Sequence, residues 1–419
     1  MRAPALRAAA RLVTMAAAVA FYTYYGIYKM VFVHFDLVGG DFLRGCFAAR
    51  NFLDGRTLYD MPTAVNPFYY PPLSVLLFLP LCALGPGAAK VAWFVLTHAM
   101  IIGAACLTYS LLSGRSRGDA VFATLVAFGF SMPLQGLILT GNLNVLIWLG
   151  LTATCYAIIS GRRGLAPGLL AVCTWIKLFP MALALPLAWR GDWDAVRRYA
   201  LIVLALGAAS LAVFGLADHV AFLVQLPSLD RYVGIFSAMS FTFAAKLLAG
   251  DQHPSFLMGA NVLFGAAIVG ACWVRSVQGS EAATDRGGVV VDMMLVMVAL
   301  LLVTPASWLF YHAFLILPQA LVLSLWLQGE RLHYPVSFAV LSVLIDAWEL
   351  IMYKLPIPPT GLTIRAIGER REEFASLYPT LYGIPFALTV AVFAWLLLNY
   401  GELRRGLAAL TDAADGVKA

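Results

Sequence analysis

The sequence is poor in charged residues. Asp, Glu, Lys and Arg make up 12% of its 419 residues, about half the share of roughly 25% found in soluble domains. Apolar residues reach 62%, and apolar stretches about 20 residues long recur from one end of the chain to the other. This composition excludes a soluble globular protein and a disordered protein. It predicts an all-α, polytopic membrane protein.

Cysteine is also scarce, and its spacing carries no signal. The six cysteines form no Cys-x-x-Cys pair and no metal-ligand spacing, and almost all fall in apolar segments. A disulfide scaffold is therefore excluded, and we expect the cysteines to be small buried apolar residues. They are Cys46, Cys82, Cys106, Cys155, Cys173 and Cys272.

The net charge of +6 does not indicate a nucleic-acid partner. The basic residues lie in short clusters between apolar stretches, and this placement is the one that orients a chain in a bilayer. No small-residue cleavage site ends the first apolar stretch, so we expect a retained first span rather than a removed signal peptide. We expect membrane lipids around the chain, no nucleic acid, and a location in the inner (plasma) membrane.

The chain has no linker, low-complexity tract or obvious repeat, so we predict a single domain over residues 1–419. Ten stretches are long enough to cross a hydrocarbon core of about 30 Å, and two awkward segments would raise the count to about twelve spans. The ten are residues 12–33, 90–112, 120–138, 143–160, 198–216, 255–274, 288–306, 309–328, 334–353 and 382–400.

The two awkward segments are 71–84, which is short, and 165–189, which Lys177 and Pro180 interrupt. If both return as hairpins, 16 of the 28 Lys and Arg residues fall on the cytoplasmic side, as the positive-inside rule favours. If both are full spans, the Arg-rich loops 114–119 and 161–164 change sides. We favour hairpins or broken helices. Under both counts the two termini are cytoplasmic and residues 34–70 are outside.

Three predicted outer loops are much longer than the inner ones. They are residues 34–70, 217–254 and 354–380. Long loops within a compact fold usually carry function, so we expect the active face to be the periplasmic or exterior one.

The first outer loop contains an amphipathic helix. Its apolar residues follow a helical spacing and are Phe42, Cys46, Ala49 and Leu53. We expect this helix to lie at the membrane surface after the first span, with Gly55 as its stop signal. Asp41 begins it, either as an N-cap or as a catalytic carboxylate. Arg44, one turn later, fits a salt-bridge partner of Asp41.

Short motifs follow one another along the chain in a fixed order. The first set is Asp41, Ala48-Ala49, Gly55, Tyr59, Tyr70-Pro71-Pro72 and Pro80-Leu81. The later ones are Thr140-Gly141-Asn142-Leu143-Asn144, Trp175-Ile176-Lys177-Leu178-Phe179-Pro180 and Thr304-Pro305-Ala306-Ser307-Trp308. Over roughly residues 12–320, this ordered set resembles glycosyltransferase family 87, the polyprenyl-phosphate-mannose-dependent enzymes of the C-type (GT-C) superfamily.

Two positions depart from the family pattern. Asn142 stands where the family has Gln, and His312 follows Trp308 by four residues, where the family has one or two histidines two or three residues after the Trp.

The resemblance implies transfer of a sugar, with mannose as the expected one, from a polyprenyl-phosphate to a hydroxyl of a lipid or glycan acceptor, with inversion. Such a transfer requires a base for the hydroxyl proton and stabilisation of the departing phosphate. Asp41 is the candidate base and Lys177 the candidate phosphate partner. Asn142 and Asn144 either bond sugar hydroxyls or satisfy backbone at a hairpin.

The remaining candidate substrate contacts are Arg44, Tyr70 and His312, of which His312 fits structural packing equally well. We expect no metal and no other cofactor, because Lys or Arg can neutralise a lipid-monophosphate leaving group.

A transporter or flippase of a lipid-linked sugar is the alternative. Charges within apolar segments, namely Lys177, Asp346 and Glu349, suit transport as well as catalysis. Lys177 could also reach an interface as a snorkelling lysine, or pair with Asp346, with Glu349 or with a bound anion. The outer amphipathic helix with Asp41 favours the transferase, because a transporter has no need of it.

Overall fold

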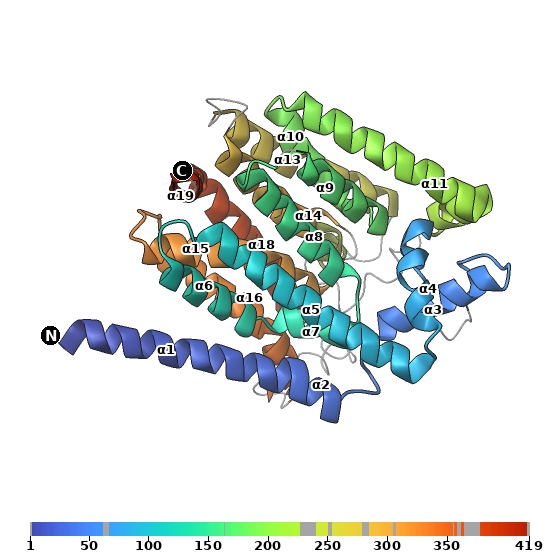
Figure 1. The fold of residues 1–419 in the computed structure, drawn as a ribbon, viewed down its shortest axis with the longest axis horizontal. Coiled ribbons are helices and arrows are strands. Elements are labelled where there is room, and N and C mark those ends of the chain that lie inside the picture. The colour runs from blue at the N-terminus through green and yellow to red at the C-terminus, as the bar shows by residue number, and fades with distance from the viewer. Residues whose placement is uncertain are drawn as a thin grey trace. The chain divides into compact units, whose positions relative to one another are not determined.

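The computed structural model describes residues 2–61, 67–162, 164–226, 240–249, 254–278, 285–304, 307–354, 356–357, 362–363 and 378–416. Helices make up nearly all of these residues (Figure 1), so the all-α prediction is confirmed. The described strands are β1 (Pro356–Ile357) and β2 (Leu362–Thr363), which pair antiparallel over two residues each.

Fewer helices than predicted are long enough to cross a membrane. Within the described residues, six helices pass by length and composition, or eight if each of two bent pairs is one span. One bent pair is α6 (Arg117–Gly129) and α7 (Met132–Thr140), which meet at 55°. Apolar composition predicted ten to twelve spans because it registers hydrophobicity but misses such breaks.

The predicted first span is a long helix with a π-helical segment near its end. It consists of α1 (Arg2–Tyr22), η1 (Thr23–Tyr28, π) and α2 (Lys29–Phe32). It therefore begins well before residue 12 and ends close to the predicted residue 33.

The chain divides into two compact units. One comprises Met1–Ala18, Leu112–Leu134 and Leu229–Ala419, and the other comprises Val19–Leu111 and Gln135–Ser228. Both are assembled from separate stretches of chain. The single-domain organisation stays a prediction.

The unit formed by Val19–Leu111 and Gln135–Ser228 contains α5 (Pro86–Leu112, all but its last residue) and a layer of three packed helices. The three are α8 (Asn144–Ile159), α9 (Leu165–Ile176) and α11 (Trp193–Gln225), which run side by side in green in Figure 1. Before a kink at Gly215, the 22 residues Trp193–Phe214 of α11 are about 33 Å long at 1.5 Å per residue, enough to cross a hydrocarbon core.

Segment 165–189 is broken as predicted, and its two halves form a hairpin. The helix α9 ends at Lys177, and the chain continues as η3 (Phe179–Ala184) and α10 (Leu185–Trp189). Trp175 donates to the carbonyl of Val203, and a Cβ on Gly168 would lie 3.8 Å from Ile202, so α9 and α11 run parallel. Three residues join α10 to α11, so α10 ends near the start of α9. The chain has therefore reversed.

Segment 71–84 is too short to be a span, as predicted. It folds as η2 (Pro72–Leu77) and α4 (Leu79–Cys82). Cys82 forms a disulfide with Cys46, with 5.4 Å between the two Cα atoms. The prediction that all cysteines are unbridged apolar residues is wrong for this pair, because two cysteines 36 positions apart give no sequence signal of pairing. The other four are free.

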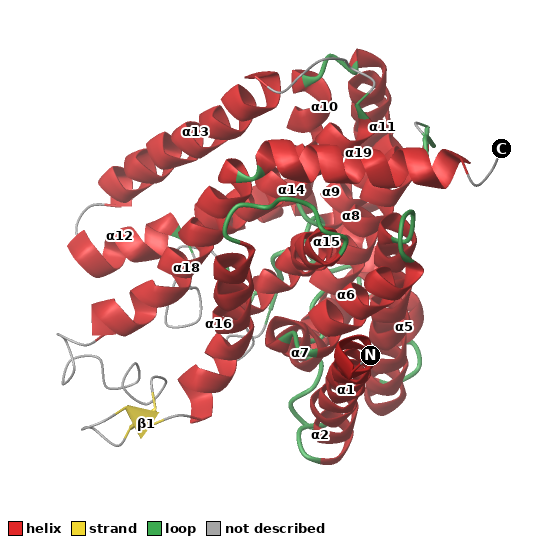
Figure 2. Ribbon diagram, turned by 90° about the vertical axis from the view of Figure 1, so that its left-hand side faces the viewer, coloured by secondary structure: helices red, strands yellow, loops and turns green. Residues whose placement is uncertain are grey.

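The other compact unit is built around α14 (Arg286–Val303), most of whose residues are buried. Around it pack α12 (Phe241–Ala249), α13 (Pro254–Gln278), α18 (Tyr378–Leu398) and α19 (Tyr400–Gly416), and Figure 2 shows α19 running across α14. The unit also holds η5 (Leu309–Leu315), α15 (Ile316–Leu327) and α16 (Pro335–Lys354).

Two predicted outer loops are described only in part. In 217–254, α11 continues to Gln225 and α12 forms a separate helix, so this segment is less of a loop than expected. Residues 227–239 and 250–253 lie outside the described residues, as does most of 354–380.

Candidate functional site

The predicted outer helix is present as α3 (Gly40–Leu53). Gly55 follows it in the left-handed conformation (φ 68°), as the predicted stop signal requires. Phe42, Ala48 and Ala49 are buried, but Leu53 is 72% exposed, so the predicted apolar face is wrong at its end. The helix buries its first turns, and Gly45 within them leaves no room for a Cβ beside Phe78.

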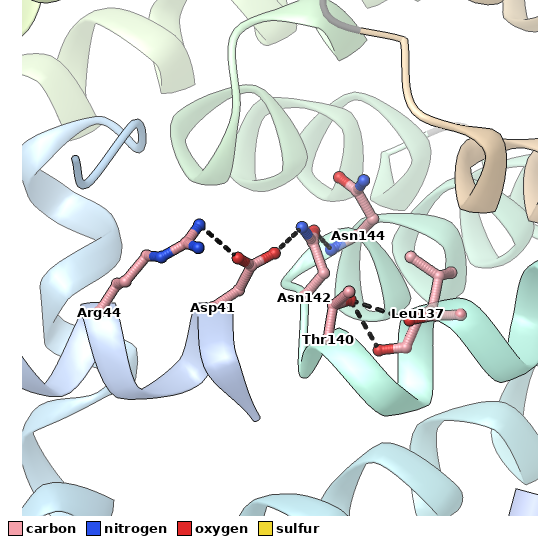
Figure 3. A network of polar contacts seen from close by, with 7 residues as sticks. Asp41, Arg44, Leu137, Thr140, Asn142 and Asn144 are labelled. Carbon is pink, nitrogen blue, oxygen red and sulfur yellow. Dashed lines mark hydrogen bonds and ion pairs between the residues drawn. The ribbon is translucent and has the colours of Figure 1, made fainter. Parts of the chain in front are cut away.

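Asp41 does not cap its own helix. Gly39 is the N-cap, with no side-chain cap bond. The carboxylate of Asp41 instead accepts two bonds, from Arg44 Nη1 at 2.7 Å and from Asn142 Nδ2 at 2.5 Å (Figure 3). The N-cap interpretation is wrong, and the predicted salt bridge with Arg44 is confirmed.

Two glycines bring Asp41 to Asn142. Gly141 has φ 65°, and a Cβ there would lie 2.7 Å from the Cα of Gly39. The amide of Gly39 also donates to the carbonyl of Leu139 at 2.9 Å. A side chain at residue 141 would therefore separate the start of α3 from the turn between α7 and α8.

The orientation of the Asn142 amide is fixed. Its Oδ1 accepts from the backbone N–H of Asn144 at 2.9 Å, so its Nδ2 must face Asp41. Asn142 thus both satisfies backbone, as one alternative predicted, and holds the carboxylate. Its Oδ1 keeps a second lone pair and its Nδ2 a second N–H, so a sugar contact stays compatible with both roles.

Lys177 sits where α9 breaks. Its backbone is extended (φ −157°, ψ 140°), and Pro180 follows in the next short helix. The Nζ atom donates to Asn144 Oδ1 at 3.2 Å and lies 5.6 Å from the centre of the Tyr70 ring and 5.8 Å from that of Phe179. The ammonium is therefore held by an amide oxygen and two aromatic rings, both of which attract cations.

Asn144 contributes one further polar atom. The residue is fully buried, and its Nδ2 makes no hydrogen bond within the described residues. A buried donor without a partner is costly, so an incoming oxygen atom would stabilise it. Asn144 Nδ2 is available for a ligand beside Lys177.

The charges around Asp41 oppose one another. Burial raises the pKa of the Asp41 carboxyl above its ordinary value, while the positive charges of Arg44 and Lys177 and the bond from Asn142 act to lower it. The shift is upward because desolvation is the largest cause. A carboxylate with a raised pKa accepts a proton more readily than an exposed one.

The backbone of Tyr70 is hydrogen-bonded by Tyr59, whose neighbours are in turn bonded to Asp218. Asp218 is not among the residues predicted from the sequence. The Tyr70 carbonyl accepts from Tyr59 Oη at 2.8 Å, and the neighbouring Thr57 and Leu58 donate to the buried carboxylate of Asp218. Only the apolar context of Asp218, close to the end of a predicted span, could have drawn attention to it. Five predicted site residues therefore share one unit and are linked through contacts: Asp41, Arg44, Asn142, Asn144 and Lys177, with the ring of Tyr70 beside the lysine.

His312 belongs to the other compact unit. It lies in η5, buried, with Nε2 2.8 Å from Thr389 Oγ1. Asp346, in the same unit, accepts from Gln319 Nε2 at 3.2 Å. Lys177 lies in the unit that holds Asp41, where it donates to Asn144 Oδ1. The side chain of Glu349 and residues Pro305 and Ala306 lie outside the described residues.

One Asp-x-Asp sequence is present, Asp192-Trp193-Asp194. Asp192 caps α11 by accepting from Ala195 N, and Asp194 forms an exposed ion pair with Arg197 at 3.4 Å. Both carboxylates serve the start of a helix, so this sequence carries no sign of a metal site.

Comparison with known proteins settles the family. The sequence profile of glycosyltransferase family 87 matches residues 68–305, more than half of the chain. The chain belongs to glycosyltransferase family 87. The resemblance inferred from the ordered motifs is therefore confirmed, and with it the class of membrane glycosyltransferases.

Two proteins similar to this chain are each named a polyprenol-phosphate-mannose-dependent alpha-(1-2)-phosphatidylinositol pentamannoside mannosyltransferase. The Mycobacterium tuberculosis protein is 26% identical over 255 residues, which cover 60% of this chain and 57% of the relative. The Mycolicibacterium smegmatis protein is 26% identical over 313 residues, which cover 74% of this chain and 71% of the relative. The chain thus spans a little over half the length of the first relative.

Proposed function

We propose that this protein transfers mannose from a polyprenyl-phosphate donor to a hydroxyl of a lipid or glycan acceptor, with inversion at the anomeric carbon. The family and the names of its relatives support the donor. One arrangement supports the chemistry above all: Asp41, Asn142, Asn144 and Lys177 form a continuous chain of polar contacts. A base and a phosphate partner thereby stand in one site.

Asp41 acts as the general base. The acceptor oxygen attacks the anomeric carbon, its proton passes to an Asp41 oxygen, and the bond from the anomeric carbon to the phosphate oxygen breaks. A single displacement of this kind inverts the anomeric centre. Arg44 and Asn142 hold the carboxylate in place before the reaction, which reduces the cost of reorganisation.

Lys177 stabilises the departing polyprenyl phosphate. Its ammonium lies at the break between α9 and η3, beside the unpartnered Nδ2 of Asn144. A phosphate there would gain a charged donor and a neutral one. Because these groups can neutralise a monophosphate, we propose that no metal ion takes part.

The site faces the exterior of the cell, with both termini cytoplasmic. The loop that carries Asp41 is tied by the disulfide between Cys46 and Cys82, and disulfides persist in oxidising compartments. The Arg-rich start of α11, with Arg197 and Arg198, fits the cytoplasmic side. The far end of the same helix contacts residues 57 and 58 of the first outer loop.

A reconstituted assay tests the proposal. Purified protein in lipid vesicles is given radiolabelled polyprenyl-phosphate-mannose and a membrane extract as acceptor source. We expect the label to appear in a new glycoside with wild type and with Asp54→Asn, an exposed carboxylate of the same loop, but not with Asp41→Asn. Labelled donor that crosses the bilayer without forming a glycoside would point to the transporter instead.

A further inference from the structure

The outer end of α11 contacts the first outer loop. Gly215 interrupts the helix with φ 73° and ψ 172°, and no atom lies within 4 Å of a Cβ built there. Its positive φ, and not a lack of space, is what disfavours another residue. Beyond this kink, Phe222 lies 6.1 Å from the ring of Tyr59, while Phe214 just before it lies 4.9 Å from Phe52.

Asp218 is the polar centre of this contact. The residue is 8% exposed, and its Oδ1 accepts from Thr57 Oγ1 at 2.8 Å and from the backbone N–H of Leu58 at 3.0 Å. Among the described residues, no basic side chain forms an ion pair with it. A buried carboxylate without a cation is expensive, so these two bonds to the loop compensate for its burial.

A series of contacts connects Asp218 to the proposed donor site. Tyr59 is adjacent to Leu58, and its hydroxyl donates to the carbonyl of Tyr70 at 2.8 Å. Burial raises the pKa of Tyr59, and the negative charge of Asp218 raises it further, so the phenol remains a donor. The ring of Tyr70 in turn lies against the ammonium of Lys177.

We infer that Asp218 is a positioning residue for the donor phosphate, which it serves by locking residues 57–59 and so placing Tyr70 against Lys177. This inference rests on the proposed role of Lys177. Asp218 itself touches neither the substrate nor the reacting atoms. Loss of the lock should loosen Tyr70, so that donor binding suffers more than the chemical step.

The hydrogen-bond geometry provides a sharp pair of variants. Because Oδ1 alone accepts both bonds, Asp218→Asn keeps the acceptor of both while it removes the charge and replaces Oδ2 by an NH2 group. Asp218→Ala removes the bonds as well. Asp54→Ala is the matched control. It removes an exposed carboxylate from the first outer loop, and among the described residues this carboxylate pairs only with Arg56.

Steady-state transfer from polyprenyl-phosphate-mannose provides the first measurement. We expect Asp218→Ala to raise the donor KM about tenfold with kcat within about threefold of wild type, as the loss of one or two net hydrogen bonds implies. Asp218→Asn and Asp54→Ala should stay near wild type. An unchanged donor KM in folded Asp218→Ala, or equal defects in the Ala and Asn variants, would overturn the inference.

A double-mutant cycle tests whether Asp218 and Tyr59 act on donor binding through the same residue, Tyr70. Tyr59→Phe removes the bond to the Tyr70 carbonyl and should also raise the donor KM. If both residues act through Tyr70, the double variant with Asp218→Ala should be little worse than the poorer single variant. Multiplied KM effects would show that they act separately.

Hydrogen exchange separates this inference from the proposed function. Amides of residues 56–61 should exchange faster in Asp218→Ala than in Asp218→Asn, whatever the substrate. If wild type makes no glycoside from polyprenyl-phosphate-mannose, the proposed function fails while the exchange difference still reports the lock. If exchange is equal in the two variants, the lock itself is refuted.

Discussion

The side-chain amide of Asn142 donates to Asp41 at 2.5 Å and is prevented from turning by the backbone N–H of Asn144, 2.9 Å from its oxygen. Asn142 therefore serves as a fixed support for the carboxylate. One N–H of its Nδ2 and one lone pair of its Oδ1 make these two bonds, and the carboxylate it supports lies at the centre of the site.

The removal of the base is the first prediction. Asp41→Asn should lower kcat by a factor of about 10²–10⁴ or more, because an amide cannot take the acceptor proton. Binding of polyprenyl phosphate, measured by competition with the labelled donor, should change little. Near-normal turnover would refute the role of Asp41, and Asp54→Asn controls for the loss of a loop carboxylate.

The second prediction concerns the acid side of the pH profile of activity. The base must be ionised, so kcat/KM should rise with pH through the pKa of Asp41, which burial raises above its ordinary value. Arg44→Met removes the charge that counteracts burial most, so the pKa should rise further and the acid limb should move to higher pH. Arg56→Met, at an exposed pair, should leave the limb in place. A shift to lower pH would contradict this account.

The third concerns Lys177. Lys177→Met should weaken donor binding strongly, since it removes the ammonium that we propose binds the donor phosphate. Thermal stability without donor should change little, because the loss of the contacts with Asn144 and two rings is offset by removal of a charge that costs roughly 2.5–3.5 kcal/mol in an apolar segment on insertion scales. Lys177→Arg should retain more activity than Met, although its planar group has a different geometry. A large loss of stability with unchanged donor affinity would make Lys177 a structural residue.

The fourth concerns the disulfide. Joint replacement of Cys46 and Cys82 by Ser should lower the free energy of unfolding by about 2–4 kcal/mol, the range typical of a disulfide. Cys106→Ser, at an exposed free cysteine, provides the control. Equal melting temperatures for wild type and the double variant would mean that the bridge does not form.

The fifth concerns sidedness. In a background without the four free cysteines, a cysteine at position 56 or 365 should react with a membrane-impermeant maleimide in intact cells, and one at 116 or 405 should not. Labelling at 116 from outside would show that loop 114–119 is not cytoplasmic. The hairpin interpretation of 71–84 would then be wrong, and this segment would be a full span.

Periodicity and residue order predicted much of this structure. The outer helix, its stop at Gly55 and the break at Lys177 follow from local patterns, because proline, glycine and apolar spacing act over a few residues. The contact between Asp41 and Asn142 joins residues 101 positions apart. It depends on the approach of two glycines, which no local pattern records.

Other features escaped prediction for the same reason. The disulfide joins two positions without a motif, and Asp218 acts across 161 residues through Thr57. The bend of 55° between α6 and α7, at residues 130 and 131, lies within one apolar stretch that gives no sign of it. His312 was grouped with the site by its place in a motif, and the structure pairs it with Thr389.

The hairpin at Lys177 has a consequence for biosynthesis. In the proposed orientation, Asp41 is exported with the first outer loop, whereas the hairpin of α9, η3 and α10 enters from the cytoplasm and returns there. The helix α9 is about 18 Å long, enough to carry its charged tip past the middle of the bilayer. The base and the lysine of the site thus arrive from opposite sides of the membrane, and a nascent chain stopped before residue 165 would display the base without the ammonium that the donor phosphate needs.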